Sequence, residues 1–163
     1  MKNLNSAAIE KMMNKALNQF IQTIDNKQYY SDKFTIIVNS DSESFISDKN
    51  IVLSNESAEK PDLKVMMSTF QETMINKAKD YTLVSEFINV IVDPNTKDKR
   101  NGIMLKNDNG YKIIRADQFK CFNKKCCNFY ISNTCNFVCV YSECWDLIGI
   151  ICPFYANIEY KVK

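Results

Sequence analysis

Hydrophobic residues near the N-terminus recur every three or four positions. Ser6 precedes this run and is a suitable N-cap. The spacing predicts an amphipathic helix over residues 6–25, whose apolar side would pack into the core or receive a partner helix. The apolar positions are Ile9, Met12, Met13, Ala16, Leu17, Phe20, Ile21 and Ile24.

Extended segments are expected next. Residues 34–38 are β-branched and aromatic and are followed by the turn composition of residues 39–42, which predicts a strand. Residues 62–67 alternate apolar and polar side chains and predict a further strand. Residues 44–46 and 51–53 are weaker strand candidates.

A second helical spacing begins near residue 69. Ser68 with Gln71, and Thr69 with Glu72, each fit a capping box. The pattern predicts a helix over residues 69–92, whole or broken near Asp80, that ends before Pro94. Its apolar positions are Phe70, Met74, Ala78, Tyr81, Val84, Ile88 and Ile91.

A charged linker over residues 95–101 divides the chain best. After it, residues 102–106 and 111–115 flank the turn sequence of residues 107–110, which predicts a β-hairpin. The organisation is thus a part over residues 1–94 and a β-rich part over residues 95–163, expected to form one cooperative domain.

All seven cysteines follow residue 120. Cys135, Phe137, Cys139 and Tyr141 fall on one side of a predicted strand, and residues 147–152 read as a second, buried strand. We therefore expect a cysteine-rich β lobe at the C-terminus. The fold class predicted for the whole chain is α+β, with two amphipathic helices packed on a mostly antiparallel sheet.

Three states are open for these cysteines. They can be small buried hydrophobes, disulfides, or zinc ligands. A zinc site would use Cys121 and Cys126 as one ligand pair with Cys139 and Cys144 as the other. Cys135 and Cys139 cannot bind one zinc ion together if they lie four apart in a regular strand, because that spacing separates them by about 13 Å. A structural zinc ion is the one cofactor that the sequence suggests.

The charge pattern offers a nucleic-acid interface. The formal net charge is only +2, but basic residues concentrate between residues 97 and 125 and interleave with Tyr111, Phe119 and Phe122. Basic side chains attract phosphates and aromatic rings stack on bases. The candidate contacts are Lys97, Lys99, Arg100, Lys112, Arg115, Lys120, Lys124 and Lys125.

Catalysis is not expected. The chain has no histidine and three glycines, so histidine-based catalysis and a glycine-rich phosphate loop are excluded. The longest uncharged apolar run, residues 147–158, is too short to span a bilayer and no secretory signal is visible, so the expected location is intracellular, cytoplasmic by default.

The expected function is therefore that of a non-enzymatic accessory or structural protein that binds other proteins, as a subunit of a larger assembly. The alternatives are nucleic-acid binding through residues 97–125 and an apolar-ligand (lipid) carrier.

Overall fold

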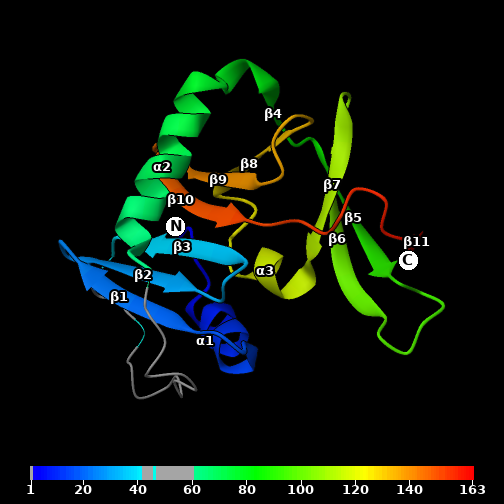
Figure 1. Ribbon diagram of the computed structural model, residues 1–163, viewed down its shortest axis with the longest axis horizontal. Helices are drawn as coiled ribbons and strands as arrows, with labels where there is room; N and C mark the ends of the chain where they lie inside the picture. The colour runs from blue at the N-terminus through cyan, green and yellow to red at the C-terminus, as the bar shows by residue number, and fades with distance from the viewer. Residues whose placement is uncertain (1, 42–45, 47–60) are drawn as a thin grey trace.

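The computed structural model describes residues 2–41, 46 and 61–163. These residues form an α+β fold with two antiparallel sheets (Figure 1). Helix α2 packs on one face of the larger sheet, through Leu63, Met67 and Met74. Helices α1 and α3 and the smaller sheet lie toward its other face, around a second cluster of buried side chains.

The elements follow one another in the order α1 (Ser6–Lys15), β1 (Phe20–Ile24), β2 (Lys27–Ser31), β3 (Thr35–Asn39), α2 (Leu63–Asn76), the 3-10 turn η3 (Ala78–Asp80), β4 (Tyr81–Leu83), β5 (Glu86–Val92), β6 (Arg100–Asn107), β7 (Gly110–Arg115), α3 (Ala116–Lys120), β8 (Cys127–Ser132), β9 (Val138–Ser142), β10 (Leu147–Ile151) and β11 (Tyr160–Val162).

The cysteine-containing strands lie inside the larger sheet. Its order is β1-β2-β3-β10-β9-β8-β4, and Ile150 of β10 is paired with Ile36 of β3. The strands β8, β9 and β10, expected in a C-terminal lobe, therefore share one sheet with the N-terminal strands β1, β2 and β3. Long-range pairing of this kind leaves no signal in the local sequence pattern.

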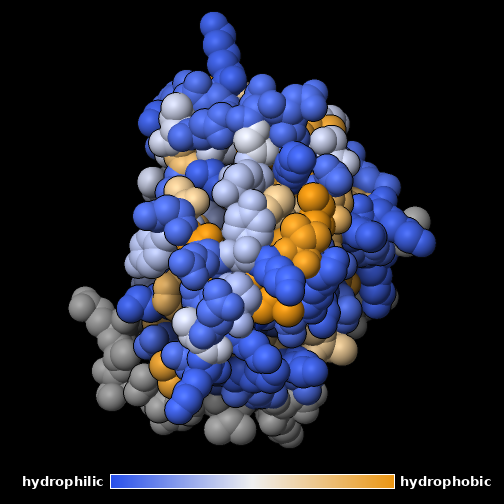
Figure 2. All heavy atoms as spheres, turned by 90° about the vertical axis from the view of Figure 1, so that its right-hand side faces the viewer, coloured by the Kyte–Doolittle hydropathy of each residue, from blue (hydrophilic) through white to orange (hydrophobic). Residues whose placement is uncertain are grey.

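The smaller sheet has the order β11-β5-β6-β7. The segment after β10 crosses it, and Phe154 and Ile158 pack there against Val90, Met104 and Ile113. Figure 2 shows that this side of the molecule is mostly hydrophilic, with hydrophobic residues gathered in a narrow band.

The N-terminal helix is shorter than predicted. It ends at Lys15, and Phe20–Ile24 form strand β1 instead of two further helical turns. Asp25 and Asn26 both have positive φ, 52° and 60°, and connect β1 to β2. Two-residue hairpin turns require that conformation and favour Asp and Asn, so this turn overrides the helical spacing of the residues before it.

Residues 62–67 are helical rather than extended, which corrects a second prediction. The Asp62 carboxylate accepts a hydrogen bond from the backbone N–H of Val65 at 3.1 Å and caps α2. The hydroxyls of Ser68 and Thr69, predicted as caps, instead donate to carbonyls four residues earlier. The helix begins one and a half turns before the predicted boxes because Asp62 supplies the cap.

The helix predicted to reach residue 92 ends at Asn76. Residues 86–92 form β5, in which buried Val90 and Val92 lie on one face and alternate with Ile91. β-Branched residues of this kind fit a strand, so the two-residue alternation of Val90 and Val92 outweighs the helical spacing of Ile88 and Ile91.

Other predictions are confirmed. The hairpin over residues 102–115 forms, with Asn107 paired to Gly110 across a two-residue loop. The strands predicted at 34–38 and 147–152 correspond to β3 and β10. The charged segment over residues 95–101, expected to divide the chain, connects the antiparallel strands β5 and β6, which pair directly with each other, so that division is not among the confirmed predictions. Except for Ile46, the weak strand candidates lie outside the described residues.

Candidate functional site

An apolar groove lies between α2 and the larger sheet. Its volume is about 570 Å³. Side chains from β1, the β2–β3 turn, α2, the segment before β9 and the end of β10 contribute to it. The lining residues are Asn18, Phe20, Ser31, Lys33, Phe34, Thr35, Ile36, Pro61, Leu63, Met66, Phe70, Asn136, Phe137, Ile150 and Cys152.

The β2–β3 turn holds Phe34 at the rim of the groove. The backbone N–H of Phe34 donates to Asp32 Oδ1 at 3.0 Å, and that of Lys33 donates to Ser31 Oγ at 3.2 Å. The Phe34 carbonyl accepts from the backbone N–H of Cys152 at 2.7 Å. The Phe34 side chain is nevertheless 51% exposed. A large aromatic side chain is thus held in place by its backbone and left open to solvent.

Helix α2 supplies the opposite wall. Its Met66 is 38% exposed, while Phe70 meets Phe137 edge to face with ring centroids 4.9 Å apart. Gln22 of β1 fixes the start of this wall, since its amide donates to the Pro61 carbonyl at 2.5 Å and accepts from the Leu63 N–H at 2.9 Å. Strand β1 and the start of α2 are therefore hydrogen-bonded to each other beside the groove.

Among the described residues that line the groove, Lys33 is the one that carries a charge. It occupies the left-handed region with φ of 78°, a conformation that is uncommon for a residue other than glycine. Burial, followed by the Asp32 carboxylate, raises the pKa of the Cys152 thiol. A raised pKa disfavours the nucleophilic thiolate form of Cys152.

The structure does not bring together the four cysteines predicted as zinc ligands. Cys121 and Cys139 belong to the clusters on opposite faces of the larger sheet, Cys126 is buried and Cys144 is exposed. Within the described part of the chain, no group of three or more Cys, Asp or Glu side chains is placed to hold a metal ion.

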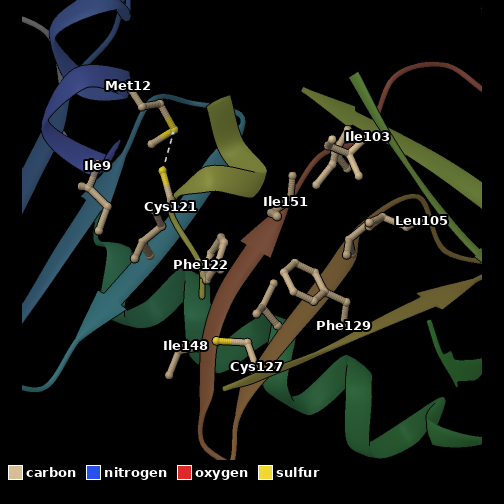
Figure 3. Close-up of a cluster of buried hydrophobic side chains, with 14 of the residues drawn as sticks. Ile9, Met12, Ile103, Leu105, Cys121, Phe122, Cys127, Phe129, Ile148 and Ile151 are labelled. Carbon is tan, nitrogen blue, oxygen red and sulfur yellow. Dashed lines mark hydrogen bonds between the residues drawn. The ribbon is translucent and has the colours of Figure 1, made fainter. Parts of the chain in front are cut away.

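The buried thiols instead contact methionines and carbonyl groups. Cys121 Sγ lies 3.7 Å from Met12 Sδ, and Cys139 Sγ lies 2.9 Å from Met74 Sδ (Figure 3 shows the first pair). Five of the seven cysteines are buried. Burial raises the pKa of Cys121 and Cys139 and raises that of Cys127 to about 12.

The predicted nucleic-acid contacts separate into groups. Lys97, Lys99 and Arg100 lie at the β5–β6 connection, and Lys112 lies on β7. Arg100 is held by Asp93 at 3.0 Å and by the Phe154 ring at 4.7 Å.

Arg115 is engaged as well, because it pairs with buried Asp32. Lys120, Lys124 and Lys125 line a second cavity, which has a volume of about 720 Å³. Lys2, which lies far from this basic segment in the sequence, joins them there.

Comparison of the chain with protein-family models, curated proteins and solved structures found no match. Among the described residues, no helix has the length and apolar character needed to cross a membrane. The local sequence pattern predicts secondary structure for Phe34, Phe70 and Phe137 but no site, since only the packing of α2 on the sheet brings them together.

Proposed function

We propose that the protein is a non-enzymatic accessory protein that binds a hydrophobic segment of a partner protein in the groove between α2 and the larger sheet. The observation that carries this proposal is the rigid, half-exposed Phe34 at the rim of an apolar groove. Exposed aromatic residues beside a preformed hollow are typical anchors of protein interfaces.

The open rim of the groove favours a polypeptide segment as the ligand. Small apolar ligands are usually buried over most of their surface, whereas Phe34 and Met66 leave this groove open to solvent. The amides of Asn18 and Asn136 are also in the lining and can hydrogen-bond to the backbone of an extended segment. Lys33 favours a segment that carries an acidic residue next to its hydrophobic ones.

The experiment is a selection from a displayed peptide library on the native protein, with binding of selected peptides then measured on variants. Phe34→Ser should weaken binding about 10- to 100-fold, because it removes a central aromatic contact. Lys33→Gln should weaken it less, and mainly at low salt.

Tyr155→Ser is the matched control, since Tyr155 is an aromatic residue that is 81% exposed and lies outside the groove. Peptides that bind Phe34→Ser as tightly as the parent protein would contradict the proposal. Enrichment of no peptide, together with stoichiometric binding of a fatty acid by native mass spectrometry, would instead support the apolar-ligand carrier.

A further inference from the structure

Four lysines converge on the second cavity from three places in the chain. Lys2 precedes α1, Lys120 ends α3, and Lys124 and Lys125 lie in the connection to β8. The same cavity is lined by Asn5, Ser6, Ala7 and Asn123 and by the apolar residues Leu4, Phe119 and Phe122. This arrangement is separate from the groove beneath α2, with which it shares no lining residue.

Backbone contacts hold Lys2 beside the other lysines. Leu4 and Phe122 form an antiparallel bridge, and the N–H of Asn123 donates to the Asn3 carbonyl at 2.8 Å. The Asn123 side-chain amide donates to the carbonyl of Lys2 itself at 3.2 Å. The N-terminal segment is therefore fixed against residues 121–123, and the cluster of four lysines is a property of the fold.

The residues that line this cavity leave the lysine charges unpaired, while Lys2 also lines an adjoining cavity with Asp41 and Asp146. None of the four lysines forms an ion pair with a described residue, and no acidic residue is among those that line the cavity. Both arginines, by contrast, are paired with aspartates. Like charges held together without partners repel one another, so an anionic ligand with several charges would be strongly attracted here.

The apolar floor that solvent reaches in this cavity consists of Leu4 and Phe119. Phe119, which is partly exposed, packs with ring centroids 5.3 Å from Phe87 and 5.4 Å from Phe129. Phe122 is buried and lies in the core beside Phe129 (Figure 3). A ligand that fits both floor and rim has a flat apolar part together with phosphates, as a nucleotide does.

We propose that this cavity binds single-stranded nucleic acid, with one base on the apolar floor and the backbone phosphates on Lys2, Lys120, Lys124 and Lys125. The volume of about 720 Å³ suits a unit of nucleotide size. The paired bases of a duplex cannot enter a cavity, and aromatic floors of this kind serve single strands. The site uses only part of the basic segment predicted from the sequence, and adds Lys2 to it.

The experiment measures the affinity of the full-length protein for a short fluorescein-labelled oligothymidylate as salt is varied. Four phosphate contacts to a single strand predict a log–log salt slope of about −2.8, which is about a 50-fold loss of affinity between 50 and 200 mM salt. The triple variant Lys120→Gln, Lys124→Gln, Lys125→Gln should reduce the slope to about −0.7 and the loss to about threefold.

The matched control is Lys97→Gln, Lys99→Gln, Lys161→Gln, which removes three exposed lysines from other parts of the protein. It should keep the parental slope, and an equal effect of the two triple variants would overturn the proposal. An abasic oligonucleotide that binds as well as oligothymidylate would also overturn it, because the floor would then contact no base.

Two competitors test the form of the ligand. Duplex DNA should compete poorly, and equal competition would contradict a single-strand site. A free nucleoside triphosphate should compete weakly, since it occupies the cavity without the flanking phosphates. If it competes as well as the oligonucleotide at equal concentration, the ligand is a free nucleotide rather than a strand. Phe34→Ser should leave all these measurements unchanged, so failure here and failure of the groove proposal are distinguishable.

Discussion

The carboxylate of Asp32, in the turn between β2 and β3, accepts a hydrogen bond from the guanidinium of Arg115 at the end of β7. The Asp32 side chain is 2% exposed and that of Arg115 is 30% exposed. Gln118 reinforces this junction, because its buried amide accepts from the Arg115 N–H at 3.0 Å and donates to the Thr35 hydroxyl at 2.8 Å. The two sheets are therefore joined by a polar contact as well as by the hydrophobic core.

Replacing Arg115 with alanine should lower the free energy of unfolding by about 3 kcal/mol, because it leaves the Asp32 carboxylate buried without its partner. The comparison is Arg100→Ala, which breaks a pair with Asp93 whose side chains are 50% and 30% exposed. That loss should be about 1 kcal/mol or less. Denaturant unfolding of both variants measures the difference, and equal losses would contradict a structural role for the Asp32–Arg115 pair.

Gly149 of β10 is expected to tolerate no side chain. A Cβ at this position would meet the ring of Phe122, and overpacking of a core costs about 1–3 kcal/mol. Gly149→Ala should therefore be destabilising by that amount in a thermal or denaturant melt. If Phe122 is the cause, the change should cost less when made in a Phe122→Leu background; additive effects of the two substitutions would show that the clash is not what matters.

The parts of the fold that the sequence predicted correctly are those with a strong local signal. The hairpin around Gly110 follows from turn residues between two apolar runs, and β10 follows from an apolar run that ends at Pro153. The wrong predictions concern apolar residues whose spacing fits both the helical period of 3.6 residues and the strand period of two. Phe20 and Ile24 are four apart, as on one helix face, but they also share one face of a strand.

The sites could be predicted only in part. Lys120, Lys124 and Lys125 are close in sequence, so the sequence alone groups them, whereas Lys2 lies beside them because residues 2–4 contact residues 122–123. The groove needed the packing of α2 on the sheet, which joins residues more than one hundred positions apart, such as Phe34 and Asn136. Local patterns carry no information on such contacts.

The buried thiols should make stability fall in alkaline solution. Burial raises the pKa of Cys127 from an ordinary value of about 9 to about 12 and raises those of Cys121 and Cys139 as well. Above about pH 9 the unfolded chain loses these thiol protons while the folded protein keeps them. The stabilisation is thus complete below about pH 9 and is lost as pH rises toward about 12.

Denaturant unfolding between about pH 7 and pH 11 measures this loss, which should approach about 1.4 kcal/mol per pH unit for each thiol that ionises only on unfolding. Cys127→Ser should make the decline shallower by about that amount. Cys144→Ser, which removes an exposed thiol, is the matched control and should follow the parent protein. A stability that is constant above about pH 9 would contradict the raised thiol pKa values.

The last prediction concerns a fragment that ends at Phe119. Such a fragment lacks β8, β9 and β10, which are central strands of the larger sheet between β3 and β4. It would also leave the buried faces of α1 and α2 without the side chains of Val138, Val140 and Cys139 that cover them. We expect it to be unfolded or aggregated, without a cooperative transition by circular dichroism or a monomer peak in size-exclusion chromatography. Removing only residues 159–163, which include the exposed edge strand β11, is the control and should leave a folded monomer of reduced stability. A monomeric, cooperatively folded fragment 1–119 would mean that the C-terminal strands are not required for the sheet, and would contradict the topology from which both proposed sites are built.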